Sequence, residues 1–152
     1  MIRSELPSRA AVLAFVAAVS APAAAHGQAN RWERTVATQL QRAVTTLHPK
    51  GFERARLTRR GPLNAEESES FPVTLEAGRS YSVIGVCDDD CTGLGLVLST
   101  PTGSELVADQ TGDNVPVVEF TPREATSYRI RVIMVGCRLN PCWYGVAIVE
   151  KR

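Results

Sequence analysis

The four cysteines of this chain lie in two short loops, Cys87-Asp-Asp-Asp-Cys91 and Cys137-Arg-Leu-Asn-Pro-Cys142. Each loop follows or precedes a run with the alternating pattern of a β-strand. An even number of cysteines downstream of an export signal predicts disulfides, because exported chains fold in an oxidising compartment. These features constrain the chain to an exported, disulfide-stapled domain of mostly β-structure.

Four cysteines allow three disulfide connectivities. Pairing Cys87 with Cys91 and Cys137 with Cys142 closes two loops that are short enough to form locally, whereas the alternative cross-links the two loops at one end of a sheet. A zinc site of four thiolates is a third interpretation, because the spacings resemble those of zinc ligands. Export disfavours zinc, so we expect two local disulfides.

Residues 1–25 have the pattern of a signal peptide, with a positively charged start, an apolar run over Ala10–Val19 and small residues at Ala23–Ala25. The run is shorter than the roughly 20 residues of a membrane-spanning helix. We expect the mature chain to begin near His26, the alternatives being cleavage after Ala29 or a retained anchor. The prediction is a periplasmic or secreted bacterial protein with no transmembrane segment after signal removal.

Residues 26–50 are predicted to form one amphipathic helix. Asn30 and Glu33 have the spacing of a capping box, and His48-Pro49-Lys50-Gly51 ends the helix. We expect the apolar stripe to face the core, with a membrane or partner surface as the alternative. The stripe consists of Trp32, Val36, Leu40, Ala43 or Val44, and Leu47.

From residue 51 to 152 the apolar pattern has a period of two. We expect an edge strand over Phe52–Leu57 with its arginines facing water, and a polar loop over residues 60–70. Seven or eight short strands without an intervening helix predict a mainly β domain, an antiparallel β-sandwich. The further strand signals are Phe71–Glu76, Ser80–Cys87, Leu94–Ser99, Glu105–Ala108, Val115–Phe120, Ser127–Gly136 and Trp143–Val149.

Two strands show which side chains should fill the sandwich. Alternation predicts one buried face on each, and Phe120, Trp143 and Tyr81 are expected to join that core. Trp143 and Tyr144 could instead form a platform on which a sugar ring stacks. The predicted buried faces are Tyr128, Ile130, Val132 and Met134 on one strand, and Tyr144, Val146 and Ile148 on the other.

Charge is balanced overall but divided along the chain. Residues 31–60 carry eight Lys or Arg against two Glu, whereas residues 61–152 carry seven against thirteen Asp or Glu, a net +6 and −6. Either the basic part is a surface for anionic lipid or polysaccharide, or the two parts dock on each other or are solvated. We favour the second interpretation and expect no nucleic-acid partner.

The inventory of reactive residues favours a protein that is not an enzyme. Its two histidines, His26 and His48, have no spacing that pairs them with a nucleophile and a carboxylate. The sequence has no phosphate-binding loop or metalloprotease motif. A carboxylate pair for glycoside hydrolysis stays open, since it is defined by separation in space.

Asp88, Asp89 and Asp90, held between two cysteines, are the candidate ligands of a weak calcium site. Calcium takes six to eight oxygens and would relieve the repulsion among adjacent carboxylates, with Asp109 or Asp113 as a further ligand. The alternative is an acidic turn in which an Asp side chain caps backbone amides. No other cofactor is expected.

The order of strands and turns resembles the bacterial pre-peptidase C-terminal domain. The resemblance spans roughly residues 52–150. It rests on Val73–Gly78 with Tyr81, Cys87–Leu98, Pro101–Gly103, and Phe120–Pro122 before Tyr128–Val132. It implies a jelly-roll β-sandwich that serves secreted proteases in substrate or matrix binding and sometimes holds calcium. Here the module has no protease domain, and Gly93 and Gly95 stand where the family often has two aspartates.

Two functions follow from these patterns. The first is an exported, non-catalytic binding module that recognises a polysaccharide, an envelope component or a protein partner through the sandwich face or the two cysteine loops. The second is a structural or assembly protein that oligomerises through its N-terminal helix. The sequence does not identify the ligand.

Overall fold

The computed structural model describes the backbone of residues 24–152 and the side chains from Arg31 onward. The predicted signal peptide therefore lies outside the described residues, apart from Ala24 and Ala25. None of the described helices has the length and apolar character of a membrane span. The elements are α1 (Ala24–Thr45), the 3-10 helix η1 (His48–Lys50), β1 (Phe52–Leu63), β2 (Ser68–Leu75), β3 (Tyr81–Cys87), β4 (Cys91–Ser99), β5 (Glu105–Asp109), β6 (Val117–Phe120), β7 (Thr126–Cys137) and β8 (Cys142–Lys151).

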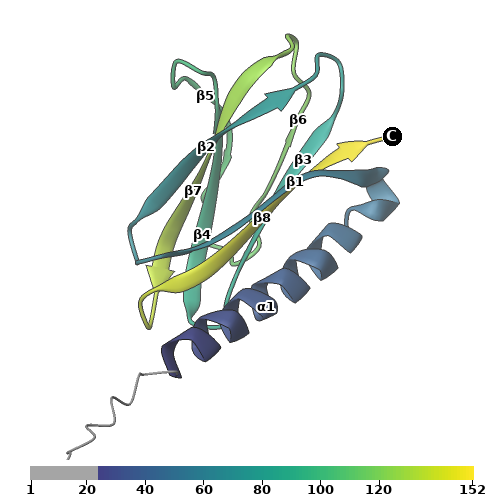
Figure 1. The fold of residues 1–152 in the computed structure, drawn as a ribbon. Helices are drawn as coiled ribbons and strands as arrows, with labels where there is room; N and C mark the ends of the chain where they lie inside the picture. The colour runs from purple at the N-terminus through teal and green to yellow at the C-terminus, as the bar shows by residue number, and fades with distance from the viewer. Residues whose placement is uncertain (1–23) are drawn as a thin grey trace, which may run out of the picture.

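The strands form two four-stranded sheets packed face to face (Figure 1). One sheet has the order β1-β8-β3-β6 and the other β2-β7-β4-β5, and every neighbouring pair is antiparallel. Eight strands in this order make a jelly roll. The predicted mainly β, jelly-roll-like sandwich preceded by one helix is confirmed.

The sandwich interior holds the side chains that the alternating pattern predicted. Both predicted faces, on β7 and on β8, are buried there together with Tyr81, and Phe120 packs against them. The Phe120 and Tyr128 rings meet edge to face, with centroids 5.3 Å apart. This interior is the main core of the protein.

Helix α1 covers the outer face of the sheet that contains β1, β8 and β3 (Figure 1). Its stripe packs on that sheet, so the core-facing prediction is confirmed: Val36, Leu40 and Leu47 are buried in a second cluster with residues of β3 and β8. A Cβ at Gly145 would lie 2.7 Å from Val36 Cγ1, so the helix approaches β8 closely where β8 has no side chain.

Three sequence predictions differ from the fold. The helix begins at Ala24, so Asn30 lies inside it and does not cap it. Strand β1 continues to Leu63 and β2 begins at Ser68, so the two strands take up most of the predicted polar loop and leave only residues 64–67 between them. Trp143 packs in the cluster under α1, on the opposite side of β8 from the sandwich interior.

Candidate functional site

The two cysteine loops lie together at one end of the sandwich, which we call the disulfide end. Cys87 is bonded to Cys91 and Cys137 to Cys142, so both disulfides are local. Cys91 on β4 pairs in register with Cys137 on β7, which brings the two loops into contact. The disulfide end is therefore made of the β3–β4 turn, residues 88–90, and the β7–β8 loop, residues 138–141.

Asp88 joins the two loops from inside. Its side chain is only 3% exposed, and its Oδ2 accepts the backbone N–H of Trp143 at 2.7 Å. Its Oδ1 accepts the N–H groups of Asp90 and Cys91, both at 3.2 Å. Burial raises the pKa of Asp88, and these hydrogen bonds oppose the rise. Asp88 therefore caps its own turn and ties that turn to β8.

This geometry gives no support to the calcium site predicted at Asp88, Asp89 and Asp90. The described residues hold no group of three His, Cys, Asp or Glu side chains placed to bind a metal ion. Asp89 is exposed while Asp88 is turned inward onto amides. Asp109 is also occupied, since it accepts hydrogen bonds from Thr111 and Val117. The arrangement is that of the alternative, a capped acidic turn.

The β7–β8 loop presents one apolar side chain to solvent. Leu139 is 69% exposed, the most exposed large apolar residue among those described. The residues beside it are anchored: Arg138 donates its backbone N–H to Asp90 O at 2.8 Å and its guanidinium to Asp89 O, and Asn140 Oδ1 accepts the N–H of Ala65 at 2.9 Å. Leu139 thus projects from a loop that is fixed on both sides.

A cleft of about 530 Å³ lies between α1 and the β3–β4 turn. Its walls mix apolar and charged groups, and Val115, which is 49% exposed, forms part of the rim. Its volume is within the range of ligand-binding clefts. The lining residues are Gln39, Arg42, Ala43, Thr46, Val86, Cys87, Asp88, Asp89, Asn114 and Val115.

Sequence reasoning singled out the two loops but missed Leu139 and the cleft. The signal for Leu139 was in the sequence, since an apolar residue inside a polar loop closed by cysteines has nowhere to be buried. The cleft had no such signal, because it is formed by packing of the helix on the sheet. The alternative of a sugar platform is wrong: Tyr144 is fully buried, so it cannot present a face beside Trp143.

The described cysteines are not free to act as nucleophiles. All four cysteines are in disulfides, and His48 is exposed in η1. A buried polar contact does occur, in which the Tyr144 hydroxyl donates to Glu69 Oε2 at 2.7 Å. Burial and the Glu69 carboxylate raise the pKa of Tyr144 to about 12, so its hydroxyl stays neutral near pH 7.

The basic part of the chain and the acidic part contact each other in the fold. Cations of residues 31–60 reach acids of residues 61–152 in several ion pairs, which supports the docking interpretation. These pairs are Lys50 with Glu119, Arg56 with Glu76 and Glu150, and Arg59 with Glu69.

Comparisons with known proteins do not place the chain in a family. No protein-family model matches the chain, and no curated protein matches it, so the resemblance to the pre-peptidase C-terminal domain stays a prediction. Two solved structures are similar in part. PliG of Aeromonas hydrophila, a periplasmic lysozyme inhibitor of g-type lysozyme, has a TM-score of 0.48 and 12% identity over 67% of this chain and 90% of its own.

The second is the carbohydrate-binding module CBM6cm-2 from Cellvibrio mixtus lichenase 5A, solved with cellotriose. Its TM-score is 0.37, with 13% identity over 68% of this chain and 92% of its own. At these scores neither similarity carries an argument about what this protein binds.

Proposed function

We propose that this chain is a non-catalytic binding module that recognises a protein partner through its disulfide end. The observation that carries the proposal is Leu139, 69% exposed at the tip of a disulfide-closed loop. Two disulfides are typical of proteins that fold outside the cytoplasm, so the partner is an envelope or secreted protein.

The loop around Leu139 is organised before any partner arrives. The Cys137–Cys142 disulfide closes it, and the Arg138 and Asn140 hydrogen bonds fix it to neighbouring segments. A binding loop that is already ordered loses little conformational entropy on association. An exposed leucine on such a loop suits an apolar pocket of a partner, and the cleft beside Val115 offers a complementary hollow on the same end.

The alternative of assembly through the helix is less well supported. The apolar stripe of α1 packs on the sheet of its own chain, so that face is not available to a second copy. The acids that remain at the disulfide end are suited to specificity in a protein contact more than to metal binding.

Affinity capture from an envelope extract tests the proposal, with the protein compared with its Leu139→Asp variant. Leu106→Asp is the matched control, because Leu106 is also an exposed leucine (43%) but lies on β5 at the other end of the sandwich. We expect a protein retained by the parent and the control to be lost from Leu139→Asp. Equal retention by Leu139→Asp would refute a role for the loop.

A further inference from the structure

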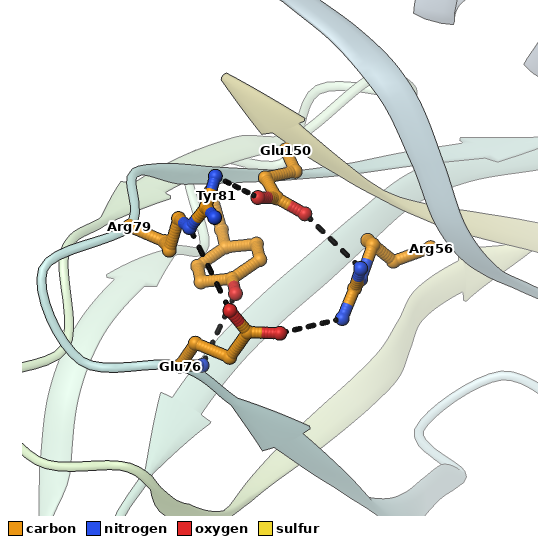
Figure 2. Close-up of polar contacts among 5 residues, drawn as sticks. All are labelled: Arg56, Glu76, Arg79, Tyr81 and Glu150. Carbon is orange, nitrogen blue, oxygen red and sulfur yellow. Dashed lines mark hydrogen bonds and ion pairs between the residues drawn. The ribbon is translucent and has the colours of Figure 1, made fainter. Parts of the chain in front are cut away.

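The end of the sandwich opposite the disulfides holds a closed ring of four charges (Figure 2). Arg56 contacts Glu76 at 3.1 Å and Glu150 at 3.3 Å, and Arg79 contacts Glu150 at 3.0 Å and Glu76 at 3.6 Å. Glu150 is only 3% exposed, and the aromatic side chain of Tyr81 lies among the four charged groups. The four charges cancel, so the ring fixes Arg79 in place without leaving a net charge.

A polar hollow of about 350 Å³ opens beside this ring. Its walls come from the start of β1, the β2–β3 turn and the end of β8, and Arg79 and the buried Glu150 line it. A smaller hollow of about 180 Å³ adjoins it, and Lys151 lines both. The remaining residues of the larger hollow are Glu53, Arg54 and Arg152, and those of the smaller one are Phe52, Ser80, Tyr81, Glu119, Phe120 and Thr121.

The charges that line the larger hollow do not balance. Its two carboxylates are already paired, Glu150 within the ring and Glu53 with Arg152 at 3.0 Å. Arg54 and Lys151 form no ion pair with any described residue; the Lys151 ammonium lies 5.6 Å from the centroid of the Phe52 ring. The hollow therefore attracts a negative charge.

Arg79 strengthens this preference. Its Nε and Nη1 are held by Glu76 and Glu150, whereas its Nη2 has no partner in the part of the chain that the structure describes. A guanidinium that is fixed before binding is well suited to hold a carboxylate or phosphate. The hollow thus offers one ligand the cations Arg54 and Lys151, unpaired within the described chain, together with the Nη2 donor of Arg79.

The adjoining hollow also offers hydrogen-bond acceptors. The hydroxyls of Ser80 and Thr121 lie 2.9 Å apart in its lining. Glu150 Oε2 is not among these acceptors, because it is buried inside the ring of charges beside Arg56. Because both carboxylates of the larger hollow are already paired, these acceptors suit hydroxyl groups of a ligand more than an ammonium group.

We propose that this end of the sandwich binds an acidic saccharide, with its carboxylate on Arg54, Arg79 and Lys151 and its hydroxyls on the acceptors beside them. The two hollows share Lys151, so more than one sugar unit fits along them. This site is separate from the disulfide end and does not depend on the protein partner proposed there. The protein would then hold an acidic glycan at one end and a protein at the other.

Titration calorimetry with trigalacturonate tests the proposal. We expect saturable binding at millimolar ligand, and a loss of roughly tenfold or more in affinity in the double variant Arg54→Gln, Lys151→Gln, which removes two cations but leaves the ring intact. The control is Arg129→Gln, Arg131→Gln, which removes two exposed cations from β7 on the other sheet and should keep the parent's affinity.

Three results would overturn the proposal. The first is an absence of saturable binding by the parent protein. The second is equal weakening by the two double variants, which would indicate attraction to net charge alone. The third is binding of maltotriose or inorganic phosphate as tight as that of trigalacturonate, since the site would then not select a saccharide that carries carboxylates.

Discussion

Removal of the Asp88 side chain tests the account of the disulfide end. In Asp88→Ala three backbone N–H groups lose their acceptor, that of Trp143 at 2.7 Å and those of Asp90 and Cys91 at 3.2 Å. An unsatisfied buried amide costs about 1–3 kcal/mol. The two longer bonds share one oxygen, and the variant no longer buries a charge, so the full sum is not lost. We expect the free energy of unfolding to fall by about 2–4 kcal/mol.

Urea unfolding followed by Trp fluorescence measures this change through the denaturation midpoint, with the slope expected to stay the same. Asp89→Ala is the control, because Asp89 belongs to the same turn but is exposed, and its removal should cost less than about 0.5 kcal/mol. A loss below 1 kcal/mol in Asp88→Ala, or equal losses in the two variants, would show that Asp88 does not hold the loops together.

Leu40→Asp should lower the free energy of unfolding by about 3–5 kcal/mol, because it buries a charge between α1 and the sheet. Gln41→Asp, on the exposed side of the helix, should not lower it. An unchanged melting temperature in Leu40→Asp would refute the packing of α1 on the sheet. The folded protein keeps the Tyr144 proton up to about pH 12, whereas the unfolded chain loses it near 10.0. The free energy of unfolding should therefore fall by up to about 2.7 kcal/mol as pH rises across that window; an absorbance titration in which Tyr144 ionises near pH 10 in the folded protein would contradict this. Because both Asp88 oxygens already accept N–H bonds, calorimetry with millimolar calcium should show no saturable heat. Saturable heat that the double variant Asp88→Asn, Asp90→Asn abolishes would instead support the calcium site predicted from the sequence.

The strands and the helix could be predicted because their patterns report which face is buried. Alternation over residues 128–134 places four side chains in the interior, and a stripe every three or four residues places α1 on a sheet. The predicted strand over Phe52–Leu57 is shorter than β1, because Gly61 and Pro62 are residues typical of loops. Pro62 lies on an edge strand, however, where a proline needs no N–H for a neighbour on the open side.

The candidate site could be predicted only where it is local. Both disulfides close short loops, so spacing alone favoured their pairing. Asp88 depends on a bond to Trp143, 55 positions away in the sequence, and nothing near Asp88 indicates that partner. The continuous apolar run of β8 is typical of a strand buried on both faces, which is the one signal that could have placed Trp143 under the helix.

The position of β8 has a consequence for the order in which the protein folds. This strand, residues 142–151, lies between β1 and β3 and also carries the surface on which α1 packs. Until β8 is synthesised, β1 has no neighbour in its sheet and the apolar stripe of α1 has mainly the residues of β3 to cover. The N-terminal helix and β1 therefore complete their packing only when the last strand joins the sheet, whereas the sheet β2-β7-β4-β5 contains no part of β8.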